Sequence, residues 1–148
     1  MKNTQIQTFD FSEVPPSWPL CFCDECPRHD ECLHFLAGQY APDRLTWGPA
    51  VYPMACHNRT CPHFKETRVI RAAYGFKPLY RHVLHEDYQT LRGQIMAYLG
   101  SYRTYYRYNK GERKLTPEQQ EHILGLVRRY VDDDDLHFEH YQDIVDFT

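Results

Sequence analysis

The 148-residue sequence contains no long run of apolar residues. A transmembrane helix needs roughly 20 consecutive apolar residues, and no stretch of the chain approaches that length. The N-terminal stretch MKNTQIQTFDFSEVPPSWPL also lacks the continuous apolar core of a secretory signal. We therefore expect a cytoplasmic protein with no membrane segment, in a compartment where thiols stay reduced and structural disulfides are rare.

The motifs of several enzyme classes are missing as well. The chain has no GxSxG sequence, no P-loop and no dinucleotide-binding fingerprint. Two histidine pairs, His82 with His85 and His137 with His140, have no carboxylate motif beside them. The four aspartates at 132–135 lack the spaced oxygen ligands and the glycine of an EF-hand loop. An enzyme is therefore not expected, unless a cysteine of depressed pKa acts as a redox nucleophile.

The sequence does contain six cysteines, and they fall into two clusters. The segment CFCDECPRHDEC holds Cys21, Cys23, Cys26 and Cys32, and the segment ACHNRTCPHF holds Cys56 and Cys61. Zinc binds thiolates tetrahedrally, usually through one close pair and one distant pair. The charged residues between these thiols do not form an apolar pattern, in which free cysteines act as small hydrophobic residues. The clusters therefore predict a zinc site, with an iron–sulfur cluster, inert buried thiols, and redox or disulfide chemistry as alternatives.

The sequence indicates thiolate ligands but does not decide which of the cysteines bind the metal. Spacing alone favours the pair Cys23–Cys26 together with the pair Cys56–Cys61. Four histidines lie among the cysteines as candidate nitrogen ligands, namely His29, His34, His57 and His63. A bound metal would also order residues 1–65, which offer few apolar anchors of their own.

Longer motifs in the chain resemble a known family. The segments CP....CL.FLAGQ, RVIRAAYGF, AYLG and TYYRYNKGERKLTPEQQ are similar to those of an uncharacterised family of short bacterial proteins. The likeness covers most of the chain and implies no activity. It does imply which thiols matter, because positions 21, 26, 32 and 61 match the family's pattern, whereas Cys23 and Cys56 are additions. The resemblance therefore points to Cys21, Cys26, Cys32 and Cys61, and four thiolates are the ligand set of many structural zinc sites.

Charge is unevenly distributed along the chain. Residues 65–114 hold eleven Lys/Arg against four Asp/Glu, a net charge of +7. Residues 115–148 hold two against nine, a net charge of −7, and residues 1–64 hold four against seven, a net charge of −3. Eight of the twelve tyrosines also lie in the basic middle. Such asymmetry indicates an electrostatic partner.

The basic segment also has the order of a helix-turn-helix. Asp87 is expected to cap a helix that ends at Gly100, and Ser101 is expected to cap a short helix over YRTYYRYN. The segment TPEQQ then predicts a further helix, with a capping box between Thr116 and Gln119. This order is similar to that of phage repressors, in which the short second helix enters the major groove of DNA.

The helix-turn-helix analogy predicts a set of DNA contacts. Arg103, Tyr105 and Arg107 would face bases, and Lys110, Arg113 and Lys114 would contact phosphates. Three alternatives remain open at this point. The tyrosines can be core residues with hydroxyls at the rim, the acidic tail can neutralise the basic segment, or an aromatic face can bind a protein.

The sequence as a whole predicts a mainly α-helical single domain over residues 1–148. Residues 1–65 form its irregular, zinc-clamped part, and residues 66–148 form its helical part with the helix-turn-helix-like arrangement. The predicted function is a small zinc-stabilised binding module, with double-stranded DNA as the favoured partner. The alternatives are a protein–protein adaptor with a purely structural metal and a thiol redox or iron–sulfur protein. The sequence does not predict an oligomeric state.

Overall fold

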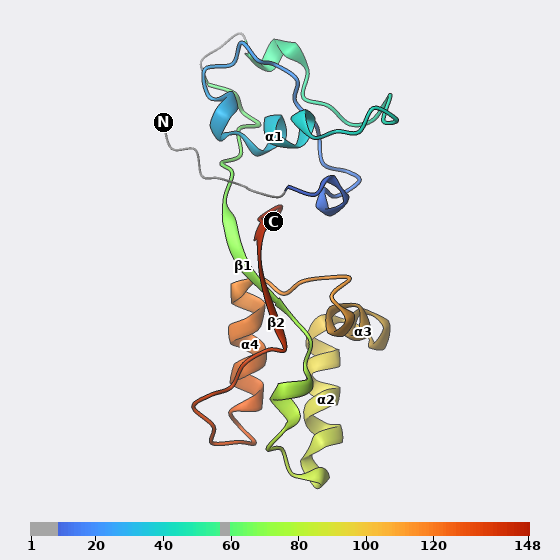
Figure 1. The fold of residues 1–148 in the computed structure, drawn as a ribbon, viewed down its shortest axis with the longest axis vertical. Coiled ribbons are helices and arrows are strands. Elements are labelled where there is room, and N and C mark those ends of the chain that lie inside the picture. The colour runs from blue at the N-terminus through green and yellow to red at the C-terminus, as the bar shows by residue number, and fades with distance from the viewer. Residues whose placement is uncertain (1–8, 57–59) are drawn as a thin grey trace. The chain divides into compact units, whose positions relative to one another are not determined.

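The computed structural model describes residues 9–56 and 60–148. Within these residues the chain forms four α-helices and a two-stranded sheet (Figure 1). The helices are α1 (Leu33–Gln39), α2 (His85–Leu99), α3 (Tyr102–Lys110) and α4 (Pro117–Val127), and the strands are β1 (Val69–Tyr74) and β2 (His140–Val145). The expected predominance of helices in the second half is confirmed.

The chain divides into two compact units. Unit 1 comprises the described residues up to Val69 together with Val145–Thr148, and unit 2 comprises Ile70–Ile144. The division lies close to the predicted boundary between residues 65 and 66. The return of the C-terminal segment to unit 1 is a feature that the sequence did not reveal.

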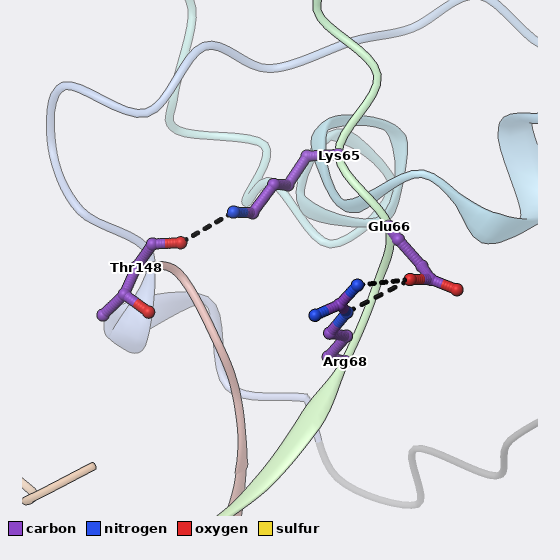
Figure 2. A network of polar contacts seen from close by, with 4 residues as sticks. All are labelled: Lys65, Glu66, Arg68 and Thr148. Carbon is purple, nitrogen blue, oxygen red and sulfur yellow. Dashed lines mark hydrogen bonds and ion pairs between the residues drawn. The ribbon is translucent and has the colours of Figure 1, made fainter. Parts of the chain in front are cut away.

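Unit 1 has little regular structure apart from α1 and three short 3-10 turns. Phe147 from the C-terminal segment packs edge-on against Trp18, with 5.2 Å between ring centroids. Lys65 donates a hydrogen bond from Nζ to the carbonyl oxygen of Thr148 at 2.8 Å, as Figure 2 shows. Arg68 donates twice to the Glu66 carboxylate on the neighbouring stretch. These contacts attach the chain's last residues to the segment that leads into β1.

Unit 2 has a single core formed by its helices and the loops around its strands. Helix α2 packs against both α3 and α4. Glu139 N–H donates to Gly75 O and Asp146 N–H donates to Arg68 O, so β1 and β2 run antiparallel. The largest fully buried side chains of this unit are Phe76, Leu79, Leu91, Ile95, Leu115, Ile123, Val127 and Phe138. Strand β1 contributes Ala73 to this core, and the neighbouring Ala72 is also fully buried.

The helix starts in unit 2 agree with the predicted caps in two of three cases. Ser101 Oγ accepts a hydrogen bond from Thr104 N–H at 3.1 Å. Thr116 Oγ1 accepts from Gln119 N–H, and Gln119 Oε1 accepts from Thr116 N–H, so the capping box is complete. The prediction for Asp87 was wrong, because α2 begins at His85 with Leu84 at its N-cap. Asp87 lies in the first turn, where a carboxylate still interacts favourably with the helix dipole.

Candidate metal centre and nucleic-acid interface

The backbone of unit 1 brings the two cysteine clusters together through pairing between distant segments. Leu20 N–H donates to Pro49 O at 3.1 Å and Val51 N–H donates to Leu20 O at 2.8 Å. Cys21 N–H donates to His34 O at 3.0 Å, which fixes the first cysteine against α1. Cys32 pairs in an antiparallel bridge with Glu66, close in sequence to Cys61. Sequence spacing did not reveal these crossings, because each joins residues far apart in the chain.

Helix α1 approaches the first cysteine closely, and Gly38 makes that approach feasible. Gly38 is buried, and a Cβ atom added to it would collide with the backbone carbonyl of Cys21. Helix α1 continues through Gly38 to Gln39. The glycine therefore serves close packing of the helix against the cysteine segment.

We expect Gly38→Ala to lower the thermal stability of unit 1. The added methyl group meets backbone, so the cost should be about 1–3 kcal/mol, as for an overpacked core. Gly125→Ala in α4 is the matched control, because nothing lies within 4 Å of its added Cβ. That control should be neutral or stabilise by up to about 1 kcal/mol, since alanine favours helix over glycine. Thermal melts of both variants test this, and equal shifts would refute the packing role of Gly38.

All six cysteines line one small cavity of about 20 Å³ in unit 1. Its other lining residues are Arg28, His29, Phe35, Val51 and Phe64. Cys21 and Cys32 are buried, and Cys26 and Cys61 are partly exposed; these four are free thiols. Cys23 and Cys56 are joined as a disulfide with 6.9 Å between their Cα atoms. The sequence had offered disulfide chemistry only as an alternative.

The electrostatics of the cavity reflect this crowding of thiols. Burial raises the pKa of the Cys21 thiol, and the nearby thiols of Cys32, Cys26 and Cys61 raise it further, against the lowering effect of a backbone hydrogen bond at Cys23. A thiolate at Cys21 is therefore disfavoured unless a cation accompanies it.

The predicted metal clamp is not preformed. Within residues 9–56 and 60–148, no three His, Cys, Asp or Glu side chains converge in the arrangement of a metal-binding group. The fold class is therefore confirmed only as helices with a small sheet, without its metal-clamped part. The six thiols share a cavity, but their sulfur atoms do not form a tetrahedral cage there.

The described histidines near the cysteines either hydrogen-bond to other groups or lie outside the cavity. His29 lines the cavity, but its Nδ1 lies 2.7 Å from Cys26 O and its Nε2 lies 2.9 Å from Asp30. The Nδ1 of His34 hydrogen-bonds Pro19 O, and its ring stacks on Trp18. His63 is exposed and does not line the cavity, and His57 lies outside the described residues. Of these three described histidines, only His29 lines the cavity of the cysteines.

A second, larger cavity of about 590 Å³ opens elsewhere in unit 1. It is lined mostly by apolar side chains, among them Trp18, Phe22, Leu45 and Trp47, and its three prolines are Pro15, Pro16 and Pro49. Trp47 is 88% exposed and Phe22 is 62% exposed. The lining contains no titratable side chain, so this groove offers an apolar contact surface rather than acid–base chemistry.

In unit 2, three predicted DNA-contacting residues lie on one exposed face of α3. Arg103, Arg107 and Lys110 are all exposed, and their spacing of four and then three residues places them along one side of a helix. Arg107 Nε lies 3.6 Å from a carboxylate oxygen of Glu112. Among the described residues, neither Arg103 nor Lys110 forms an ion pair. We call these three residues the basic face of α3.

The loop that follows α3 carries the two remaining predicted phosphate contacts. Arg113 is exposed, and its backbone N–H donates to Arg107 O at 3.2 Å. Lys114 is partly buried and donates from Nζ to Gly111 O at 3.5 Å. The loop is therefore folded back onto the end of α3, which keeps Arg113 near the basic face.

The prediction that Tyr105 reads bases was wrong. Its side chain is only 3% exposed and stacks on Phe76, with 4.7 Å between ring centroids. Its hydroxyl lies 2.9 Å from the hydroxyl of Tyr80, and burial raises the pKa of both phenols. Tyr105 and Tyr108, three residues apart, are the buried side of α3. That spacing was the signal for a core position.

The acidic tail does not cover the basic face. Of the four aspartates at 132–135, Asp133 lies 4.0 Å from His82 Nε2, and Asp135 N–H donates back to Asp133. In Figure 1 the loop with these aspartates follows the end of α4 that lies away from α3. The described part of the chain shows Glu112 as the sole carboxylate paired with the basic face. The tail does pair with the basic segment elsewhere, because Arg71 Nη1 lies 3.6 Å from a carboxylate oxygen of Asp143.

Sequence reasoning missed an arginine on α2 that lies against α3. Arg92 donates from Nη2 to the hydroxyl of Tyr106, and its guanidinium carbon lies 5.9 Å from the ring centroid of Tyr102. A hydrogen bond from Tyr102 and the charge of Arg92 lower the pKa of Tyr106. The aromatic pair at 102 and 106 was visible as an i, i+4 spacing, but no sequence signal placed Arg92 beside it.

Comparisons with known proteins identify a family but no activity. A family model described as a family of unknown function (DUF6078) matches residues 1–147. No curated protein and no solved structure matches the chain. As for membranes, no helix in the described parts of the chain is both long and apolar enough to span a bilayer.

Proposed function

Because the chain belongs to the DUF6078 family, whose function is unknown, its own sites must supply the argument, and we propose that it is a nucleic-acid-binding module. Double-stranded DNA is its partner, and α3 is the helix that enters the major groove. The single observation that carries this proposal is the basic face of α3, which is exposed on three positions while the opposite side of the helix is buried. Short second helices of helix-turn-helix proteins contact DNA through such a face.

The surroundings of α3 support the same function. Helix α2 packs against α3 and precedes it by a turn at Gly100, whose φ of 102° suits glycine. Arg113 extends the positive charge beyond the helix, and phosphate contacts of this kind supply much of the affinity for DNA. Among the described residues, Glu112 is the one carboxylate that forms an ion pair with the basic face.

Fluorescence anisotropy with a labelled duplex tests the proposed function. If about three or four phosphates are neutralised, the logarithm of the binding constant should fall with the logarithm of salt concentration at a slope near −3. Binding that ignores salt, or no binding to any duplex at low salt, would refute the proposal. The arginine variants that localise the interaction are described in the Discussion.

We also propose that Zn²⁺ stabilises unit 1 through Cys21, Cys26, Cys32 and Cys61. These free thiols share one cavity, their chemistry suits zinc, and a divalent cation would offset the unfavourable charge of thiolates in a buried place. Zinc is proposed ahead of an iron–sulfur cluster because the cysteine spacing is not that of a ferredoxin. When bound, zinc would supply structural crosslinking of the two cysteine segments, with no catalytic step.

A second candidate function rests on the apolar groove of unit 1. Ligand-binding grooves are typically lined by apolar and aromatic side chains, and Trp47 and Phe22, which line this groove, are exposed. The chain would then be a protein–protein adaptor with a structural metal. A partner that survives nuclease treatment and is lost on Trp47→Ser, but kept in an Arg103→Ala/Arg107→Ala variant, would support this function. A partner that is kept in the Trp47→Ser variant and lost in the Arg103→Ala/Arg107→Ala variant would refute the adaptor function.

A further inference from the structure

Tyr102 is exposed at the first turn of α3 although the fold does not need an aromatic residue there. Its side chain is 63% exposed, whereas Tyr105 and Tyr108 already fill the buried side of the helix. The ring of Tyr106 lies one turn further on, with 4.6 Å between the two centroids. Both rings therefore form a surface that begins beside Arg103. We call Tyr102, Tyr106 and Arg92 the aromatic platform.

A cation holds the aromatic platform in place. The guanidinium carbon of Arg92 lies 5.7 Å from the Tyr106 centroid and 5.9 Å from the Tyr102 centroid. The hydrogen bond from Arg92 to the Tyr106 hydroxyl joins α2 to α3 at this point. The platform thus combines a largely exposed tyrosine with a positive charge from α2, and Tyr102 directly precedes Arg103 of the basic face of α3.

We propose that the aromatic platform is a stacking site for an unpaired nucleobase. This inference rests on the proposed function, because the basic face of α3 must bring the nucleic acid to the site. Tyrosine faces contribute to single-strand binding by stacking on bases, whereas phosphates are bound by the adjoining arginines and lysines. A base inside an intact duplex has both faces stacked on its neighbours, so it cannot occupy Tyr102. The preferred partner is therefore a duplex that carries a single-stranded extension or an unpaired base.

The neighbouring chemistry fits this ligand better than a purely apolar one. Arg103 lies next to Tyr102 in sequence and is exposed without an ion pair among the described residues. A nucleotide bound here would place its base on the ring and its phosphate near arginine. Base stacking tolerates any sequence, so the site selects for strand state rather than for sequence.

Anisotropy with two probes tests the inference, namely a blunt duplex and the same duplex with a short single-stranded extension. Stacking of one base should make the extended probe bind about 5-fold to 150-fold tighter. Tyr102→Ala should remove that preference and leave binding of the blunt duplex unchanged, whereas Tyr102→Phe should retain it. A 2-aminopurine base placed at the junction should change its fluorescence on binding to the parent and to Tyr102→Phe, but not on binding to Tyr102→Ala.

The outcomes separate this inference from the function on which it rests. Equal binding of the two probes, or equal weakening of both by Tyr102→Ala, overturns the stacking site while duplex binding stands. If the isolated single strand binds as tightly as the extended duplex and depends on Tyr102, the stacking site stands and the duplex proposal falls. Tyr141→Ala is the matched control, because Tyr141 on β2 is an exposed tyrosine whose ring centroid lies 5.3 Å from the guanidinium carbon of Arg71 on β1. It should bind both probes as the parent does, and a lost preference in this control would overturn the assignment to Tyr102.

Discussion

The double variant Arg103→Ala/Arg107→Ala is expected to bind duplex DNA at least about 30-fold more weakly than the parent at low salt. Each arginine that contacts a base or phosphate contributes roughly 1–3 kcal/mol, and Arg107 contributes at the lower end because Glu112 already pairs with it. Both side chains are exposed on α3, so their removal should leave the helix and the core intact. Anisotropy measures the affinity, and far-UV circular dichroism checks the fold.

The matched control for this variant is Arg128→Ala/Arg129→Ala. These two arginines are also exposed and adjacent to the end of α4, so the control removes the same charge from the same unit. This control loses two positive charges that do not contact DNA, so its affinity for the duplex should fall by less than about threefold at moderate salt. If both double variants lose the same affinity, the interaction depends on net charge alone and α3 is not the recognition helix.

Cys26→Ser is expected to abolish zinc binding and to unfold unit 1. The free energy of structural zinc binding is folding free energy, of the order of 10 kcal/mol in small zinc domains, and unit 1 has little regular structure besides α1. Both tryptophans of the chain, Trp18 and Trp47, lie in this unit. Tryptophan fluorescence therefore reports on unit 1, whereas far-UV circular dichroism reports mainly on the helices of unit 2.

The double variant Cys23→Ser/Cys56→Ser is the control for the cysteine prediction. It removes the two thiols that are joined to each other and should retain about one zinc ion per chain, as four-thiolate sites do. Elemental analysis of protein purified without added metal measures the zinc. A parent chain without metal, or a Cys26→Ser variant with unchanged zinc and melting, would contradict the clamp. Iron with a brown absorbance would instead favour the iron–sulfur alternative.

The helix caps of unit 2 were predictable because their signals are local. The capping box between Thr116 and Gln119 and the cap at Ser101 need only residues three positions apart. Asp87 was misplaced by the same local reasoning, since an aspartate suits the first turn of a helix as well as its cap. Cap residues thus predict that a helix begins nearby more reliably than they predict where.

The candidate sites were only partly predictable, because each depends on segments distant in the sequence. The basic face of α3 follows from helical spacing, but Tyr105 was assigned to the exposed face although its spacing from Tyr108 indicates the opposite, buried side. Arg92 joins α3 across a helix contact that has no sequence signature. In unit 1, the shared cavity of the cysteines depends on bridges such as that between Leu20 and Ala50, which cysteine spacing does not encode.

The most direct test of the account is a nuclear magnetic resonance titration of the ¹⁵N-labelled chain with a short duplex. The chain of 17.7 kDa is small enough for amide resonances to be followed individually. If α3 is the DNA-binding helix, the largest shift changes fall in residues 101–114, with Arg103, Arg107 and Lys110 among them, while the core amides of α4 change little. Shift changes concentrated around Trp47 and the apolar groove of unit 1, or no changes at all, would contradict the assignment of α3 as the DNA-binding helix.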